Sequence, residues 1–225
     1  MQSLRVMWTV FIKDLRVEWR NRETLSSMCV FGLLVVFLFN FSFETAREET
    51  LRLLPGLLWV AFAFAGILGF NRSFASEREN SCLEGMRLAP VDPSMIFLGK
   101  LLANLLFLGI AEAVVVIAAS ICYKFSFAPA LGWFALIVFS GTVGYAALGT
   151  IFGAIAANTR MREVMLPVLQ FPVAFWILIL AIDATSDALR GTTASSLTAG
   201  VLRVAGVSVV FTVAAFLLFE YVLEE

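Results

Sequence analysis

Hydrophobic residues along the 225-residue chain gather into long runs that are almost free of charge. A run of roughly 20 apolar residues can cross the hydrocarbon core of a bilayer as a helix, which satisfies its own backbone. Apolar and polar positions do not alternate inside the runs, so the strands of a membrane barrel are not indicated. The pattern predicts an all-α integral membrane protein, one transmembrane domain over residues 1–225. Its six spans are expected at Leu25–Phe43, Leu53–Phe70, Ile96–Tyr123, Ala128–Ala157, Val164–Ile182 and Leu197–Tyr221.

Residues 1–24 follow an amphipathic pattern instead. Apolar side chains recur there at helical spacing, at Leu4, Trp8, Phe11, Leu15 and Trp19. Most basic residues of this stretch fall elsewhere on the helix, which is typical of a helix lying in the membrane interface. The alternative is the start of a signal peptide, but acidic residues interrupt the stretch and no small-residue cleavage pattern follows. We therefore expect an interfacial helix over Met1–Thr24.

One long polar segment, Asn71–Lys100, separates the second and third apolar runs. Its Ser76–Glu84 part has a helix-compatible composition, and Pro90 and Pro93 then break the helix. We interpret the segment as a short helix with a rigid turn that docks a soluble partner protein. The alternative is a merely solvated loop. The candidate coupling residues are Glu79, Leu83, Glu84, Arg87 and Pro90.

The distribution of Lys and Arg predicts the orientation, because cytoplasmic loops carry an excess of these residues. With the N-terminus inside, 11 of the 16 basic residues fall on the cytoplasmic side. This arrangement places both termini and the Asn71–Lys100 segment in the cytoplasm.

Composition excludes several classes of function. The chain has no His, which removes the commonest general base, metal ligand and axial haem ligand. Its three Cys are isolated, so no zinc site is indicated, and Cys29 and Cys122 fall in apolar runs as packing residues. The net charge of −1 without a basic cluster disfavours nucleic acid as a partner. No phosphate-binding loop motif is present. We expect a non-catalytic subunit that binds no cofactor itself.

Ionisable residues inside a membrane are functional candidates by default. Glu112 lies near the middle of the third span, and Asn104 lies two turns earlier on about the same face. These side chains could contact a substrate or a proton, or Glu112 could simply bond to a neighbouring helix. Lys100 and Arg203, near span ends, are expected to snorkel toward the interface.

Small residues and prolines mark two further spans. Gly149, Gly153 and Ala157 form a small-residue face that permits close helix approach, most simply within the monomer and otherwise at a subunit interface. Pro167 and Pro172 interrupt the fifth span and are expected to kink it, as a static feature or a moving part.

Several short motifs occur in a particular order along the chain. They are Asp14-Leu15-Arg16, Pro55-Gly56-Leu57-Leu58-Trp59-Val60-Ala61, Leu83-Glu84, Leu88-Ala89-Pro90, Lys100-Leu101-Leu102-Ala103, Leu166-Pro167-Val168-Leu169 and Ala181-Ile182-Asp183-Ala184. In this order the chain resembles, over nearly its full length, the CcmB family of permease subunits from the haem-exporter complex of cytochrome c maturation. Two departures are that Asn80-Ser81-Cys82 replaces the family's acid-Gly-Ser/Thr, and that Glu112 stands where an apolar residue is usual.

The resemblance implies the fold of ABC-2 type exporters and a place in a bacterial or mitochondrial-type inner membrane. It implies an ATPase partner, CcmA, which binds ATP, and a membrane partner, CcmC, which handles haem. It also implies a small membrane subunit, CcmD, and the haem chaperone CcmE, whose haem-loaded form the complex releases. Exporters of this class need two permease halves, so a second copy of the chain is a further possible partner.

Three other functions stay open. A permease of the same architecture for a lipid, glycan or drug differs in the proteins that copurify with it. A secondary transporter needs mid-membrane ion-coupling residues, often on paired repeats, and this chain offers one Glu and no visible repeat. A purely structural assembly subunit would move nothing.

Overall fold

The computed structural model describes residues 2–42, 47–79, 92–157, 159 and 161–224. Within these residues the chain is helical and contains no strand. The elements are α1 (Gln2–Asn21), α2 (Glu23–Ser42), α3 (Arg47–Glu79), α5 (Pro93–Cys122), the 3-10 helix η1 (Ala128–Ala130), α6 (Leu131–Ala157), α7 (Arg162–Arg190) and α8 (Ala194–Glu224). The predicted all-α class is confirmed.

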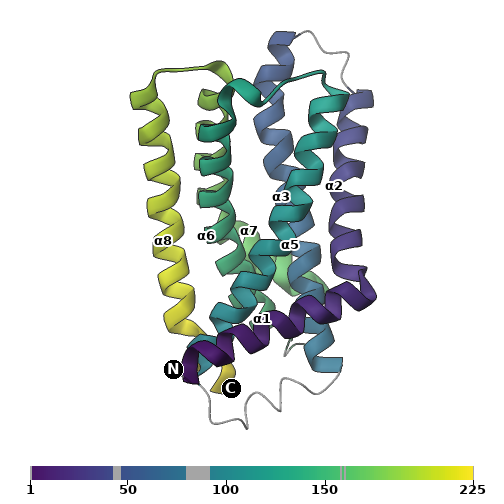
Figure 1. The fold of residues 1–225 in the computed structure, drawn as a ribbon, viewed down its shortest axis with the longest axis vertical. Helices are drawn as coiled ribbons and strands as arrows, with labels where there is room; N and C mark the ends of the chain where they lie inside the picture. Colours follow the sequence, from purple (N-terminus) through teal and green to yellow (C-terminus); the bar gives the residue numbers. More distant parts are fainter. Residues whose placement is uncertain (1, 43–46, 80–91, 158, 160, 225) are drawn as a thin grey trace.

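Six segments among the described residues are long and apolar enough to cross a membrane, which confirms the predicted number of spans. They are Glu23–Ser42, Arg52–Phe74, Pro93–Cys122, Ala128–Ala157, Val164–Arg190 and Ala194–Val222. The helices that carry them run side by side, and the two ends of the chain lie at the same end of the bundle (Figure 1).

The fifth span is longer than hydropathy predicted. The expected end at Ile182 is wrong, because α7 continues to Arg190. The side chain of Asp183 is exposed, while Thr185 is buried and accepts a hydrogen bond from Trp59 Nε1 at 2.9 Å. This interhelical bond lets a polar turn extend the helix. The helix ends at Gly191, whose φ of 68° is the left-handed conformation that glycine adopts readily.

The N-terminal helix α1 is a separate element that lies across the lower ends of the spans (Figure 1). It ends at Asn21, and its predicted place in the membrane interface stays a prediction. Arg22 forms the corner between α1 and α2 and has a φ of 54°. Its N–H donates to Glu18 O at 2.7 Å, which closes the last turn of α1. The left-handed residue turns the chain sharply from α1 into α2, the first candidate span.

The core of the bundle is built around α6, which packs against α3, α5, α7 and α8. A Cβ at Gly149 would lie 2.1 Å from ring atoms of Phe70, and a Cβ at Gly153 would lie 2.8 Å from the ring of Phe74. Both rings belong to α3, so the small-residue face serves close packing within the monomer.

The polar segment Asn71–Lys100 is helical at both of its ends. α3 continues through Glu79, and α5 begins at Pro93 with Asp92 as its N-cap, whose side chain accepts from Ser94 N at 2.9 Å. The predicted helix Ser76–Glu84 overlaps α3 as far as Glu79. The coupling candidates Leu83, Glu84, Arg87 and Pro90 lie outside the described residues, as does the side chain of Glu79.

Candidate functional site

A polar network joins α1 to the adjacent ends of three spans. We call it the basal network and define it as Asp14, Glu18, Glu23, Arg72, Ser73, Phe74 and Lys100. At its centre, Lys100 Nζ of α5 lies 2.9 Å from Asp14 Oδ2 of α1. The same ammonium donates to Ser73 O at 3.3 Å and lies 5.2 Å from the ring centroid of Phe74, both on α3. One lysine therefore holds α1, α3 and α5 together.

Close backbone approach between α1 and α5 makes this ion pair possible. A Cβ at Gly99 would lie 2.7 Å from Met7 O and 2.8 Å from Val10 Cβ. A larger residue at Gly99 would push α1 away from α5, next to the position of Lys100. Sequence reasoning missed Gly99, since a single glycine at a span end carries no signal of which helix it faces.

The second part of the basal network fixes α2. Glu18 of α1 is buried, and its Oε1 accepts a hydrogen bond from Leu25 N at 2.7 Å. This bond satisfies one of the free N–H groups in the first turn of α2. Arg72 of α3 forms an ion pair with Glu23, the first residue of α2. The two ends of the Asn71–Lys100 segment are thus fastened, one to α2 and the other to α1.

The snorkelling predicted for Lys100 is wrong. Lys100 is only 1% exposed, because α1 covers it and supplies the acid Asp14 as its partner. A buried ammonium needs such a counter-charge, since an isolated charge is costly away from water. Arg203 is exposed, and its Nε donates to Ala199 O on the preceding turn of α8. Its predicted snorkelling stays a prediction.

The two predicted intramembrane polar residues both bind α6. Asn104 Nδ2 donates to Thr150 Oγ1 at 2.9 Å, and Glu112 Oε1 accepts from Thr142 Oγ1 at 2.7 Å. Asn104 and Glu112 are eight residues apart on α5, and Thr142 and Thr150 are eight residues apart on α6. The two bonds therefore join α5 and α6 at two levels about two helical turns apart. The bond to Thr142 matches the simpler alternative for Glu112, a contact with a neighbouring helix.

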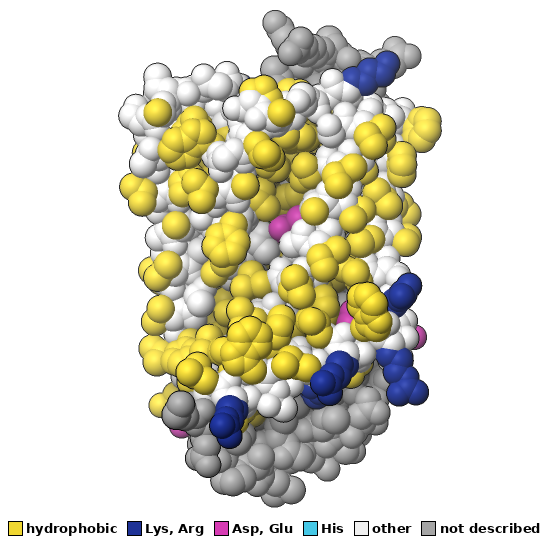
Figure 2. Space-filling model, viewed as in Figure 1, with side chains coloured by type: hydrophobic (Ala, Val, Ile, Leu, Met, Phe, Trp, Pro, Cys, Tyr) yellow, Lys and Arg dark blue, Asp and Glu magenta, His cyan; other side chains and the backbone are white. Residues whose placement is uncertain are grey.

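Glu112 is buried in the bundle. Its exposure is 5%, and it is the one acid among the residues of α5 and α6. Figure 2 shows acidic atoms in a hollow of the apolar face at about mid-height. A role in contacting a substrate or a proton stays a prediction.

Further polar contacts inside the bundle were not singled out from the sequence. Tyr145 Oη donates to Ala63 O at 2.6 Å, and Gln170 Nε2 donates to Tyr145 O at 3.4 Å. Their occurrence as polar residues within apolar runs could have indicated these contacts, because such side chains form hydrogen bonds to other helices. Pro167 and Pro172 lie inside α7, which the structure assigns as continuous. Their predicted kink stays a prediction.

The described residues offer no cluster of three or more His, Cys, Asp or Glu side chains that could hold a metal ion. The basal network can act mechanically, because its charged contacts link the ends of the polar segment, the helix α1 and three spans.

Comparison with known proteins identifies related sequences. The family model described as CcmB protein matches residues 5–220. A protein of Pseudomonas aeruginosa named "Heme exporter protein B" is 27% identical over 181 residues, which cover 80% of each chain. A protein of the same name from Paracoccus denitrificans is 26% identical over 185 residues, covering 82% of this chain and 84% of the relative.

A third relative, "Heme exporter protein B" of Escherichia coli K12, is 28% identical over 105 residues, or 47% of this chain. This match spans about half of the Escherichia coli protein, 48% of its length.

Proposed function

The chain belongs to the CcmB family, and from this premise we propose that it is the membrane permease subunit of a haem-exporting ABC complex. It couples ATP hydrolysis on a partner ATPase to export of haem or to release of a haem-loaded chaperone. The names of the relatives, "Heme exporter protein B", support the cargo. The partners in this proposal are the ATPase CcmA, the membrane subunits CcmC and CcmD, and the chaperone CcmE.

The observation that carries the proposal is the attachment of the Asn71–Lys100 segment at both ends. Arg72 is paired with Glu23, and Lys100 is paired with Asp14. A subunit without a nucleotide site receives work through contact, so the segment that meets the ATPase must pass force to the spans. The basal network provides that connection to α1, α2, α3 and α5.

The proposed fold is that of an ABC-2 type exporter half, in which residues 80–91 meet the ATPase. The proposed cellular location is the inner membrane of a bacterium or of a mitochondrial-type organelle, with both termini in the cytoplasm. The basic residues of α1 lie at the same end of the bundle as the termini, which supports this orientation (Figure 2).

The first test is purification in a mild detergent followed by identification of copurifying chains. We expect an ABC ATPase and a haem-handling membrane subunit. Recovery of an ATPase together with lipid- or glycan-processing proteins would instead indicate a permease for another substrate. Recovery of the chain without any ATPase would contradict the proposal.

The second test addresses the coupling residues. Leu83→Ala should weaken ATPase copurification more than Glu79→Ala, because truncating a buried apolar anchor commonly costs about 2 kcal/mol and an interface-rim charge costs less. Pro90→Ala should preserve binding but lower chaperone release per ATP hydrolysed. Parent-like binding and release by all three variants would show that the segment is a solvated loop.

A further inference from the structure

The helix α1 presents three different faces around its axis. The face toward the bundle carries the buried residues Val10, Asp14 and Glu18. A second face is apolar and exposed, and it carries Leu4, Trp8, Ile12 and Trp19. Trp8 is 52% exposed and Trp19 is 79% exposed, although both are large hydrophobic residues. Their exposure indicates contact with the membrane rather than with the protein.

The third face is basic. Arg5, Arg16 and Arg20 are exposed and fall within an arc of roughly 60° when successive residues are placed at the helical repeat. This basic arc lies directly beside the apolar face. Arg22, just beyond the helix, adds a guanidinium 5.7 Å from the ring centroid of Trp19. Around the helix, the buried face meets the bundle, the apolar face suits lipid acyl chains, and the basic face suits lipid headgroups.

The acids of α1 do not neutralise this arc. Asp14 is held by Lys100 and also lies 3.2 Å from Lys13 Nζ, while Glu18 accepts from Leu25 N. Both carboxylates are turned inward and occupied within the chain, so the described acids of α1 leave the basic arc with its positive charge. A sequence-level count of charge would have treated them as partners of the arginines.

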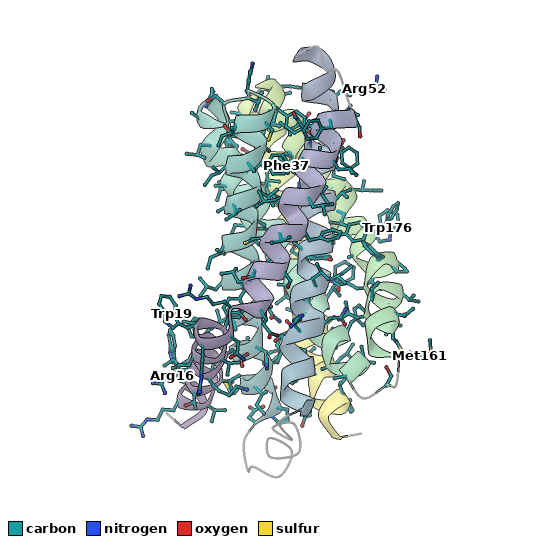
Figure 3. The ribbon with its side chains drawn as sticks, turned by 90° about the vertical axis from the view of Figure 1, so that its right-hand side faces the viewer. Arg16, Trp19, Phe37, Arg52, Met161 and Trp176 are labelled. Carbon is teal, nitrogen blue, oxygen red and sulfur yellow. The ribbon has the colours of Figure 1, made fainter. Side chains whose placement is uncertain are left out.

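The position of the arc fits the level of lipid headgroups. Arg16 and Trp19 both lie on the part of α1 turned away from the spans in Figure 3, whereas Arg52 lies at the opposite end of the bundle. Figure 2 shows Lys and Arg side chains along the lower edge of the apolar surface. Tryptophan is enriched at this depth of a membrane, and a guanidinium can bind phosphate oxygens bidentately.

We propose that Arg5, Arg16 and Arg20, beside the exposed Trp8 and Trp19, form a binding surface for the phosphate groups of anionic phospholipids. A lipid is the occupant because the basic arc, from Arg5 to Arg20, borders an exposed apolar face that runs from Leu4 to Trp19. A phospholipid carries both an anionic phosphate and acyl chains. This binding does not depend on the cargo or on the ATPase.

The experiment compares phospholipid retention by the purified full chain. The protein is exchanged into micelles with phosphatidylglycerol and phosphatidylcholine, and the retained lipids are counted by native mass spectrometry. Each basic residue near an anionic surface strengthens attraction by roughly fivefold. The Arg16→Gln/Arg20→Gln double variant should therefore lower the preference for phosphatidylglycerol by about tenfold or more. High salt should lower the preference of the parent.

Two control variants show whether a change in lipid preference comes from the basic arc. Arg52→Gln/Arg203→Gln removes the same charge from exposed sites away from α1 and should keep the preference of the parent. Arg16→Lys/Arg20→Lys keeps the positive charge and should retain most of the preference for phosphatidylglycerol. Its result therefore separates a loss of lipid binding from a loss of folding. Equal retention by the parent and the Arg16→Gln/Arg20→Gln variant would overturn the proposal. Unchanged lipid preference with loss of a copurifying protein would identify the basic arc as a protein interface and also overturn it.

Discussion

Lys100 of α5 and Asp14 of α1 form an ion pair, with Nζ 2.9 Å from Oδ2, that is almost completely covered by protein. The pair connects the start of the third span to α1, which lies outside the six candidate spans. Because Lys100 also donates to Ser73 O, the same contact brings together the two ends of the polar segment between the second and third spans. Movement of that segment would therefore be transmitted directly to α1 through this ion pair.

Breaking this pair from one side should be strongly destabilising. Asp14→Asn leaves the ammonium of Lys100 buried without its counter-charge, and the loss of one partner of a buried pair costs about 3–5 kcal/mol. Lys100→Met should cost a similar amount. The double variant should recover part of the loss, because neither charge then stays buried alone. Unfolding midpoints of the four proteins in detergent give the coupling energy, and strictly additive losses would contradict the pairing.

The ion pair of Arg72 with Glu23 is the matched control. These side chains are 50% and 66% exposed, so water screens their attraction. Exposed pairs typically contribute about 1 kcal/mol or less. Arg72→Gln should therefore lower the unfolding midpoint much less than Lys100→Met does, although both residues sit at ends of the same segment.

Close packing against α6 predicts a second contrast in stability. Gly149→Ala would place a Cβ 2.1 Å from ring atoms of the buried Phe70, which also packs on Tyr145 with ring centroids 5.6 Å apart. Overpacking of this kind costs about 1–3 kcal/mol. Gly206→Ala on α8 meets no atom within 4 Å and should be neutral or slightly stabilising. Equal unfolding midpoints for the two variants would show that α3 can move aside without cost.

The spans could be predicted because a membrane-spanning helix requires a long apolar run, which is visible in the sequence. The partners of its polar residues could not, since they depend on which helices become neighbours. Lys100 shows this limit: its position near a span end predicted snorkelling, while the structure covers it with α1. The end of α7 was missed for the same reason, because the bond from Trp59 to Thr185 joins two helices whose proximity the sequence does not reveal.

The small-residue face was easier to interpret. Gly149 and Gly153 recur one turn apart, and such a spacing predicts close approach whatever the partner is. The sequence left open whether that partner belonged to the same chain, and the rings of Phe70 and Phe74 on α3 answer it. The residues proposed to meet the ATPase remain predictions, because residues 80–91 lie outside the described part of the chain.

The predicted topology can be checked by labelling Cys82. With both termini in the cytoplasm, an impermeant thiol reagent should modify Cys82 in inverted membrane vesicles and leave it unmodified in intact cells. A cysteine introduced at Arg160 should behave in the same way, since the predicted topology places the connection between the fourth and fifth spans on the same side of the membrane. Cys82→Ser provides the background from Cys29 and Cys122, which lie in or at the end of spans. Modification of Cys82 from the outside alone would reverse the orientation.

Glu112 provides the last prediction, because its hydrogen bond to Thr142 can be preserved while its ionisable proton is removed. Glu112→Gln keeps an oxygen acceptor 2.7 Å from Thr142 Oγ1, so we expect stability within about 1 kcal/mol of the parent and unchanged chaperone release. Glu112→Leu removes the bond and should cost up to about 1.7 kcal/mol, the upper range for interhelical hydrogen bonds in membranes. Asn104→Leu is the matched control, since it removes the equivalent bond to Thr150 two turns away. A Glu112→Gln protein that is as stable as the parent but inactive in chaperone release would show that the carboxyl group exchanges a proton or contacts the cargo.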